Sequence, residues 1–97
     1  MPIFVVLGKL TQMAIENAKM IEQRDLKGEQ IFKEAGGKLL AHYYTLGRYD
    51  FVIIVDMPSI EALAKVRFEL GKWGTITTET MAALLPEQIH KVAKEVL

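Results

Sequence analysis

The sequence predicts a single α+β domain with a four-stranded antiparallel sheet and two long helices on one of its faces. Three observations support this: short apolar runs rich in β-branched and aromatic residues, stretches of helical spacing between them, and glycine or proline at the junctions. The resulting order is β-α-β-β-α-β plus a C-terminal helix. That order defines the ferredoxin-like, split βαβ arrangement, and one such domain should span residues 1–97.

The first strand is predicted over Ile3–Leu7, with Gly8-Lys9-Leu10 leading out of it. Thr11 is a suitable N-cap for the following helix, because its hydroxyl can accept a hydrogen bond from a backbone N–H of the first turn. Good helix formers then dominate from Gln12 to Ala35.

Glycines should first disturb and then end this helix. Because an interior glycine costs about 1 kcal/mol relative to alanine, Gly28 predicts a bend or irregular turn within residues 24–28. Gly36-Gly37 should end the helix, one of the pair supplying the left-handed conformation.

The second strand, Lys38–Leu46, runs through the polar turn Gly47-Arg48-Tyr49-Asp50 into the third strand, Phe51–Val55. Simple alternation divides the second strand into two faces: Leu39, Ala41, Tyr43 and Thr45 on one, and Leu40, His42, Tyr44 and Leu46 on the other.

Proline and serine mark the next boundaries. Pro58 stops the third strand because it has no N–H for the ladder, and Ser59 can cap a helix that continues to about Lys72. Thr75–Leu85 is the predicted fourth strand, and Pro86 should open a short terminal helix. The apolar residues of that helix recur at helical spacing: Ile89, Val92, Ala93 and Val96.

The first and third strands are apolar on both faces. A strand with one wet face should alternate apolar and polar residues, but Phe51–Val55 is five apolar residues in succession. Since both crossover helices lie on one face of the sheet, a second copy of the chain should cover the other. We therefore expect a homodimer or a higher homo-oligomer.

Composition narrows the function classes. Twelve Lys and Arg balance 12 Asp and Glu, so the long-range attraction needed for nucleic acid or anionic membranes is lacking. The absence of cysteine excludes disulfides and thiolate chemistry, and two histidines, His42 and His90, do not form a metal-binding spacing. We expect neither metal nor cofactor. Met1-Pro2-Ile3-Phe4 does not begin a signal peptide, which predicts a cytoplasmic protein.

The stretch Tyr43-Tyr44-Thr45-Leu46-Gly47-Arg48-Tyr49-Asp50 resembles the aromatic-Thr-Leu-Gly-x-Tyr-Asp stretch of the GYD domain family. The family's acidic residue before proline is matched by Asp56-Met57-Pro58, and its Gly-x-Val-x-Thr-x-Thr pattern by residues 74–80. Thr11-Gln12-Met13-Ala14 departs from the family's Thr-x-x-Gly opening. The resemblance implies a dimeric α/β barrel, a superfamily that holds cofactor-independent monooxygenases, isomerases, haem-handling enzymes and amino-acid sensors. Fold alone therefore selects no function.

The turn motif has a structural and a functional interpretation. Gly47 permits positive φ, and the Asp50 carboxylate can bind local backbone N–H groups to stabilise the turn. In the alternative, Tyr49 and Asp50 face a ligand.

A ligand site is predicted between the helices and the sheet, since the sheet-to-sheet layer of the dimer should be filled with apolar side chains. The candidate ligand-binding residues are Tyr43, Tyr49, Asp50, Thr78 and Thr80. His42, beside two tyrosines, is the alternative general base. We expect a small-molecule-binding or regulatory protein; the alternatives are a cofactor-independent monooxygenase or isomerase using Tyr, His and Asp, and a structural oligomer without ligand.

Overall fold

The structure, a computed structural model, describes residues 2–96. Its elements, in chain order, are β1 (Ile3–Leu10), α1 (Gln12–Glu16), the 3-10 turn η1 (Ala18–Met20), α2 (Ile21–Glu34), β2 (Lys38–Tyr44), β3 (Phe51–Asp56), α3 (Ile60–Gly71), β4 (Ile76–Ala83) and α4 (Pro86–Lys94).

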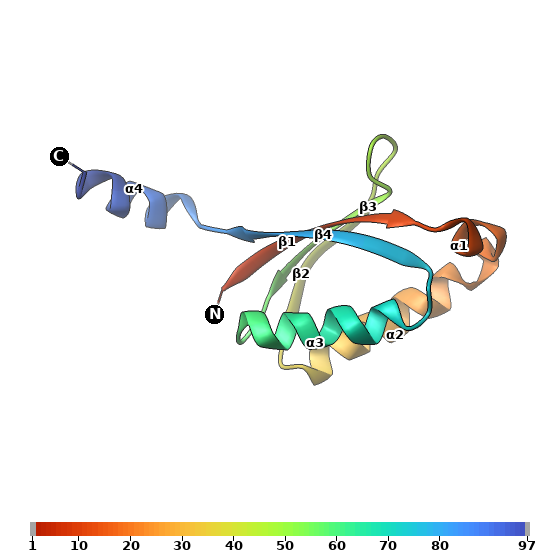
Figure 1. Ribbon diagram of the computed structural model, residues 1–97. Coiled ribbons are helices and arrows are strands. Elements are labelled where there is room, and N and C mark those ends of the chain that lie inside the picture. The colour runs from red at the N-terminus through yellow and green to blue at the C-terminus, as the bar shows by residue number, and fades with distance from the viewer. Residues whose placement is uncertain (1, 97) are drawn as a thin grey trace.

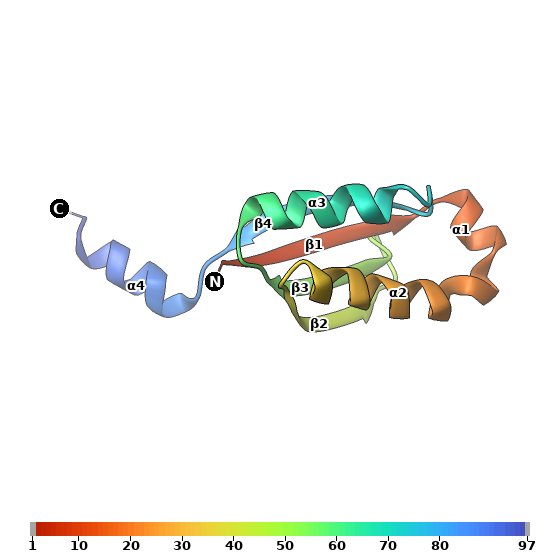
Figure 2. The same cartoon turned by 90° about the horizontal axis from the view of Figure 1, so that it is seen from below.

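The four strands form one antiparallel sheet in the order β2-β3-β1-β4. Figures 1 and 2 show α2 and α3 side by side on one face of this sheet, with no element on the other. The predicted α+β, ferredoxin-like fold with a C-terminal helix is therefore confirmed.

The hydrophobic core lies between the sheet and the two helices. Side chains alternate along β1 and β3, so that Phe4, Val6, Phe51, Ile53 and Val55 are buried beneath the helices. The alternate residues of both strands are only half-buried on the uncovered face; we call this face, made by Ile3, Val5, Leu7, Val52 and Ile54, the bare face.

The capping residues, glycine and proline predicted most helix ends correctly. Thr11 Oγ1 accepts a hydrogen bond from the Ala14 N–H at 3.3 Å, and Ser59 Oγ accepts one from the Ala62 N–H at 3.1 Å. Gly36 ends α2 with a left-handed φ of 84°, and Pro86 is the first residue of α4.

The predicted bend within residues 24–28 is wrong. Helix α2 runs unbroken through Gly28, where a Cβ would meet only Leu70 of α3, at an ordinary 3.7 Å. The helical stretch is interrupted earlier, at Asn17, whose φ of −111° and ψ of 38° are not helical and whose side-chain amide donates to the Met13 carbonyl at 2.9 Å. Helix α2 thus accommodates a glycine at this position without a bend.

The predicted facing of the second strand is also wrong beyond Leu39. A β-bulge lies between Leu39 and Ala41, so that Leu39 pairs with Val55 while Ala41 pairs with Ile54. This shift of the pairing register by one residue brings His42 and Tyr44 to the helix-covered side of the sheet. Tyr43 lies on the bare face instead.

Several strand ends also differ from the prediction. β1 continues to Leu10, since residues 8–10 pair with β4, whereas β2 ends at Tyr44 and β4 ends at Ala83.

Helix α4 extends away from the rest of the molecule at the end of β4 (Figure 1). It contains no buried residue, and its large apolar side chains, Ile89 and Val92, are exposed, as are Leu85 just before it and Val96 just after it. This helix has an apolar stripe with nothing of its own chain against it.

Candidate functional site

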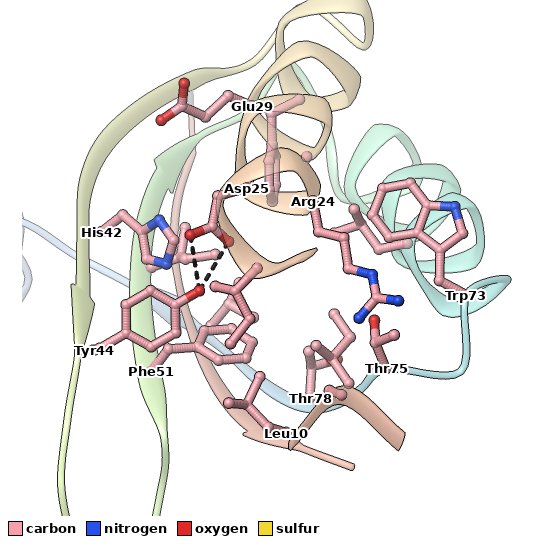
Figure 3. Close-up of a pocket in the computed structure, with 18 of the residues that line it drawn as sticks. Leu10, Arg24, Asp25, Glu29, His42, Tyr44, Phe51, Trp73, Thr75 and Thr78 are labelled. Atoms are coloured by element: carbon pink, nitrogen blue, oxygen red, sulfur yellow. Dashed lines mark hydrogen bonds between the residues drawn. The ribbon is translucent and has the colours of Figure 1, made fainter. Parts of the chain in front are cut away.

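A cavity of about 80 Å³ lies between α2 and the sheet (Figure 3). Its wall is mostly apolar, with side chains from both helices and every strand, among them Leu10, Phe32, Phe51, Leu70 and Ile76. The wall also contains Trp73 and a set of polar residues: Arg24, Asp25, Glu29, His42, Tyr44, Thr75 and Thr78. Such a wall, apolar with a few polar groups, is typical of small-molecule sites.

One side of the cavity carries a hydrogen-bonded cluster. The Tyr44 hydroxyl donates to the Asp25 carboxylate, at 2.8 Å from both oxygens, and the His42 ring centroid lies 5.1 Å from that of Tyr44. Burial, and then the hydrogen bond and negative charge of Asp25, raise the pKa of Tyr44 well above its ordinary value. Tyr44 is therefore a hydrogen-bond donor held in its neutral form at physiological pH.

The other side carries a cation. Figure 3 shows the Arg24 guanidinium pointing toward Thr75, away from Asp25 and Tyr44. Arg24 Nη1 is buried without a hydrogen-bond partner among the described residues, and Thr75 is 3% exposed. Trp73 and Thr78 line the same side.

The spacing of α2 brings these groups to the sheet. Ile21, Asp25, Gly28 and Phe32 are separated by four, three and four residues, so they lie on one helix face, which is the face toward the cavity. Arg24 is on the same side, one residue from Asp25. The missing side chain of Gly28 leaves part of the cavity open.

Of the predicted ligand-binding residues, only Thr78 lines this cavity. Thr80 pairs with Val6 on the same side of the sheet but is exposed on the edge strand β4. Tyr43 is 64% exposed on the bare face, because the bulge in β2 reverses its orientation. The expected convergence of these side chains is thus absent from the cavity, and their binding role stays a prediction.

Tyr49 and Asp50 anchor the β2–β3 loop to distant strands. An Asp50 carboxylate oxygen accepts a hydrogen bond from the Leu10 N–H of β1 at 2.8 Å, and the Asp50 N–H donates to the Gly8 carbonyl at 2.8 Å. The Tyr49 hydroxyl donates to the Glu79 carboxylate of β4. Asp50 therefore binds backbone, as the structural interpretation expects, but its partner lies 40 residues away and not within the turn.

Two further features belong to this loop. Tyr49 and Thr78 border a second surface depression with Lys9 and Arg48, which shares Thr78 with the cavity. Gly47 has the expected positive φ, 158°, which residues with a side chain rarely adopt, although a Cβ at this position would have nothing within 4 Å.

His42, the alternative general base, lies in the cavity wall. The sequence prediction missed Arg24, Asp25 and Tyr44. A usable signal was present: two charged residues interrupt the face of the helical stretch that Ile21 and Phe32 otherwise make apolar. Within residues 2–96 no three potential metal ligands lie together, and no helix is long and apolar enough to cross a membrane.

The fold is a ferredoxin-like α+β domain with a cavity between its helices and its sheet. The chain belongs to the GYD domain family, whose model matches residues 4–93. It is 31% identical over 85 residues to a Thermus thermophilus protein named "Glutamine synthetase and cystathionine beta-lyase binding protein", a match that covers 87% of this chain and 90% of the relative.

Solved structures share the fold at low sequence identity. The crystal structure of MtbAldR matches 87% of this chain with a TM-score of 0.65 and 14% identity, and this chain spans only 52% of its length. FFRP-DM1 matches 87% of this chain over its whole length, with a TM-score of 0.59 and 19% identity. A Rhodopseudomonas palustris protein of unknown function, RPA0582, matches 88% of this chain and 84% of its own length, with a TM-score of 0.57 and 19% identity.

Proposed function

We propose that this protein is a regulatory binding protein that holds a small organic molecule in the cavity between α2 and the sheet. The observation that carries the proposal is the convergence of polar side chains from α2, β2 and β4 on one mostly apolar cavity. A purely structural oligomer would have a filled helix–sheet layer at this place, so the cavity disfavours that alternative.

The relative from Thermus thermophilus supports a binding role over a catalytic one. It carries the name of a binding protein for two enzymes, and this chain covers most of its length. By analogy, the ligand of the present protein would control its association with an enzyme partner in the cytoplasm.

Self-association forms the second part of the proposal. The bare face is built from half-buried aliphatic side chains, and a second copy placed face to face would bury them. The exposed stripe of α4 adds apolar surface that its own chain does not cover. A homodimer with more than about 1,000 Å² of total buried surface accounts for both features.

A variant that fills the cavity tests the binding role. Gly28→Leu places a side chain in the cavity wall, and Ala64→Leu, at an exposed position of α3, is the matched control. Metabolites screened by thermal unfolding should stabilise the wild type and Ala64→Leu but not Gly28→Leu; a ligand at 100 times its Kd contributes about 2.7 kcal/mol. Ligands that stabilise all three proteins equally would place binding elsewhere.

A cofactor-independent enzyme, a monooxygenase or isomerase, is the second candidate, favoured by His42 beside the Tyr44–Asp25 pair in the cavity wall. For a molecule found in the screen, turnover that disappears in His42→Gln while affinity is retained would establish catalysis. Binding without turnover in the wild type supports the binding protein.

A further inference from the structure

The guanidinium of Arg24 is a cation without a counter-ion among residues 2–96. The ion pair within 4 Å found in that part of the chain joins Lys72 and Glu69 at the surface. Asp25, the next residue along α2, turns toward β2 and is hydrogen-bonded by Tyr44. Glu29, the other carboxylate of the cavity wall, points away from Arg24 in Figure 3.

A buried, unpaired polar group of this kind is costly. Nη1 of Arg24 has lost its contact with water and gains no protein acceptor in exchange. An acceptor with a negative charge would satisfy both the hydrogen-bonding capacity and the charge of the guanidinium. On the side of the cavity formed by Arg24, Thr75 and Thr78, the guanidinium thus lacks an anionic hydrogen-bond acceptor among the described residues.

The rest of the cavity limits what the anion can be. Arg24 is the one lysine or arginine in its wall, and two carboxylates, Asp25 and Glu29, are also present, so a multiply charged phosphate is disfavoured. A planar carboxylate matches the fork of a guanidinium. The apolar wall and the volume of about 80 Å³ favour a short hydrocarbon chain behind that carboxylate.

We propose that the cavity binds a small monocarboxylate with a short aliphatic chain, its carboxylate on Arg24 and its chain against the apolar wall. This inference rests on the binding function proposed above and names the class of its ligand. His42 and the Tyr44–Asp25 pair lie on the opposite side, where they contact the far end of the molecule.

Trp73 provides a direct measurement, since it is the single tryptophan of the chain and lines the cavity beside Arg24. Its fluorescence is followed while butyrate, butyramide or butylammonium is added at constant ionic strength. Butyramide has nearly the same shape as butyrate but no charge, and butylammonium has the opposite charge. We expect saturable changes with butyrate and at least tenfold weaker binding of both other probes.

Two arginine variants complete the experiment. Arg24→Met replaces the guanidinium with an apolar side chain of similar length. The substitution should weaken the binding of butyrate at least tenfold and leave the affinity for butyramide unchanged. Arg67→Met, which removes an exposed arginine on α3, should bind butyrate like the wild type. Should Arg24→Met not fold, the three probes on the wild-type protein still decide the question.

The outcomes separate this inference from the binding function. Butyramide binding as tightly as butyrate, or full butyrate affinity in Arg24→Met, would overturn the carboxylate assignment and leave a neutral-ligand cavity. No saturable response to butyrate up to 100-fold above the concentrations of ordinary metabolites, on the order of 0.1 M, would overturn it as well. The proposed binding function itself fails only if the metabolite screen also finds no ligand that stabilises the wild type but not Gly28→Leu.

Discussion

The two faces of the sheet contain the same kinds of residue in different surroundings. Along β3, Phe51, Ile53 and Val55 are 5%, 9% and 0% exposed beneath the helices. Val52 and Ile54, which alternate with them, are half-buried on the bare face. An apolar strand therefore indicates that both faces need a cover, and this chain supplies a cover for one of them only.

The largest difference between the faces should appear in Phe51→Ala. Phe51 packs in the core over Gly8, where a Cβ would overlap the phenylalanine ring, so truncation should lower the free energy of unfolding by about 3–5 kcal/mol. Val52→Ala, the neighbouring change on the bare face, should cost only about 1 kcal/mol. Denaturant unfolding measures the free energy of unfolding of both variants. Equal losses in the two variants would contradict the expected difference between the faces.

A charge on the bare face should break self-association and leave the subunit folded. Ile54→Lys puts an ammonium at the centre of the proposed interface, opposite Val5, and should raise the dissociation constant about 100-fold, or about 3 kcal/mol. Light scattering after gel filtration gives the mass, and circular dichroism checks the fold. Ala64→Lys on exposed α3 is the control. A monomeric wild type would reject the interface.

Asp50→Ala should have an intermediate effect, since it removes a hydrogen bond from the Leu10 N–H to a charged acceptor. The expected loss in the free energy of unfolding is about 1–3 kcal/mol, measured by denaturant titration. Arg48→Ala, in the exposed part of the same loop, should cost less than about 0.5 kcal/mol. A loss at Arg48 as large as that at Asp50 would show that the loop is held by other contacts.

The smallest expected effect is a pH dependence at Tyr44. Its pKa is raised in the folded protein, so the unfolded chain loses this proton first, and the stability contributed by Tyr44 is present below about pH 10 and declines above it. Urea unfolding between pH 9 and 11 should show a shallower decline in Tyr44→Phe than in wild type. Tyr43→Phe, the neighbour on the bare face, should retain the decline due to Tyr44.

Most elements could be predicted because their signals are local. Thr11, Ser59 and Pro86 mark helix starts by their own hydrogen-bonding chemistry, and Gly36 ends α2 through its φ. Gly28 misled the prediction because its cost is a local quantity, whereas the continuity of α2 also depends on α3, which packs beside it from far along the sequence.

The candidate site could be predicted only in part. We expected it between the helices and the sheet because apolar side chains should fill the sheet-to-sheet layer of the dimer, and Thr78 and His42 do line a cavity there. The bulge at residues 39–41 exchanged the faces of Tyr43 and Tyr44, and no feature of the strand sequence shows such a one-residue slip.

The sequence by itself determined the order of elements, the capping of the helices and the need of two strands for cover on both faces, because periodicity and capping act within a few residues. Only the tertiary structure decided that Arg24 has no counter-ion among residues 2–96 and that Asp25 meets Tyr44. These facts depend on how a helix and two strands, remote in the chain, approach one another across the core.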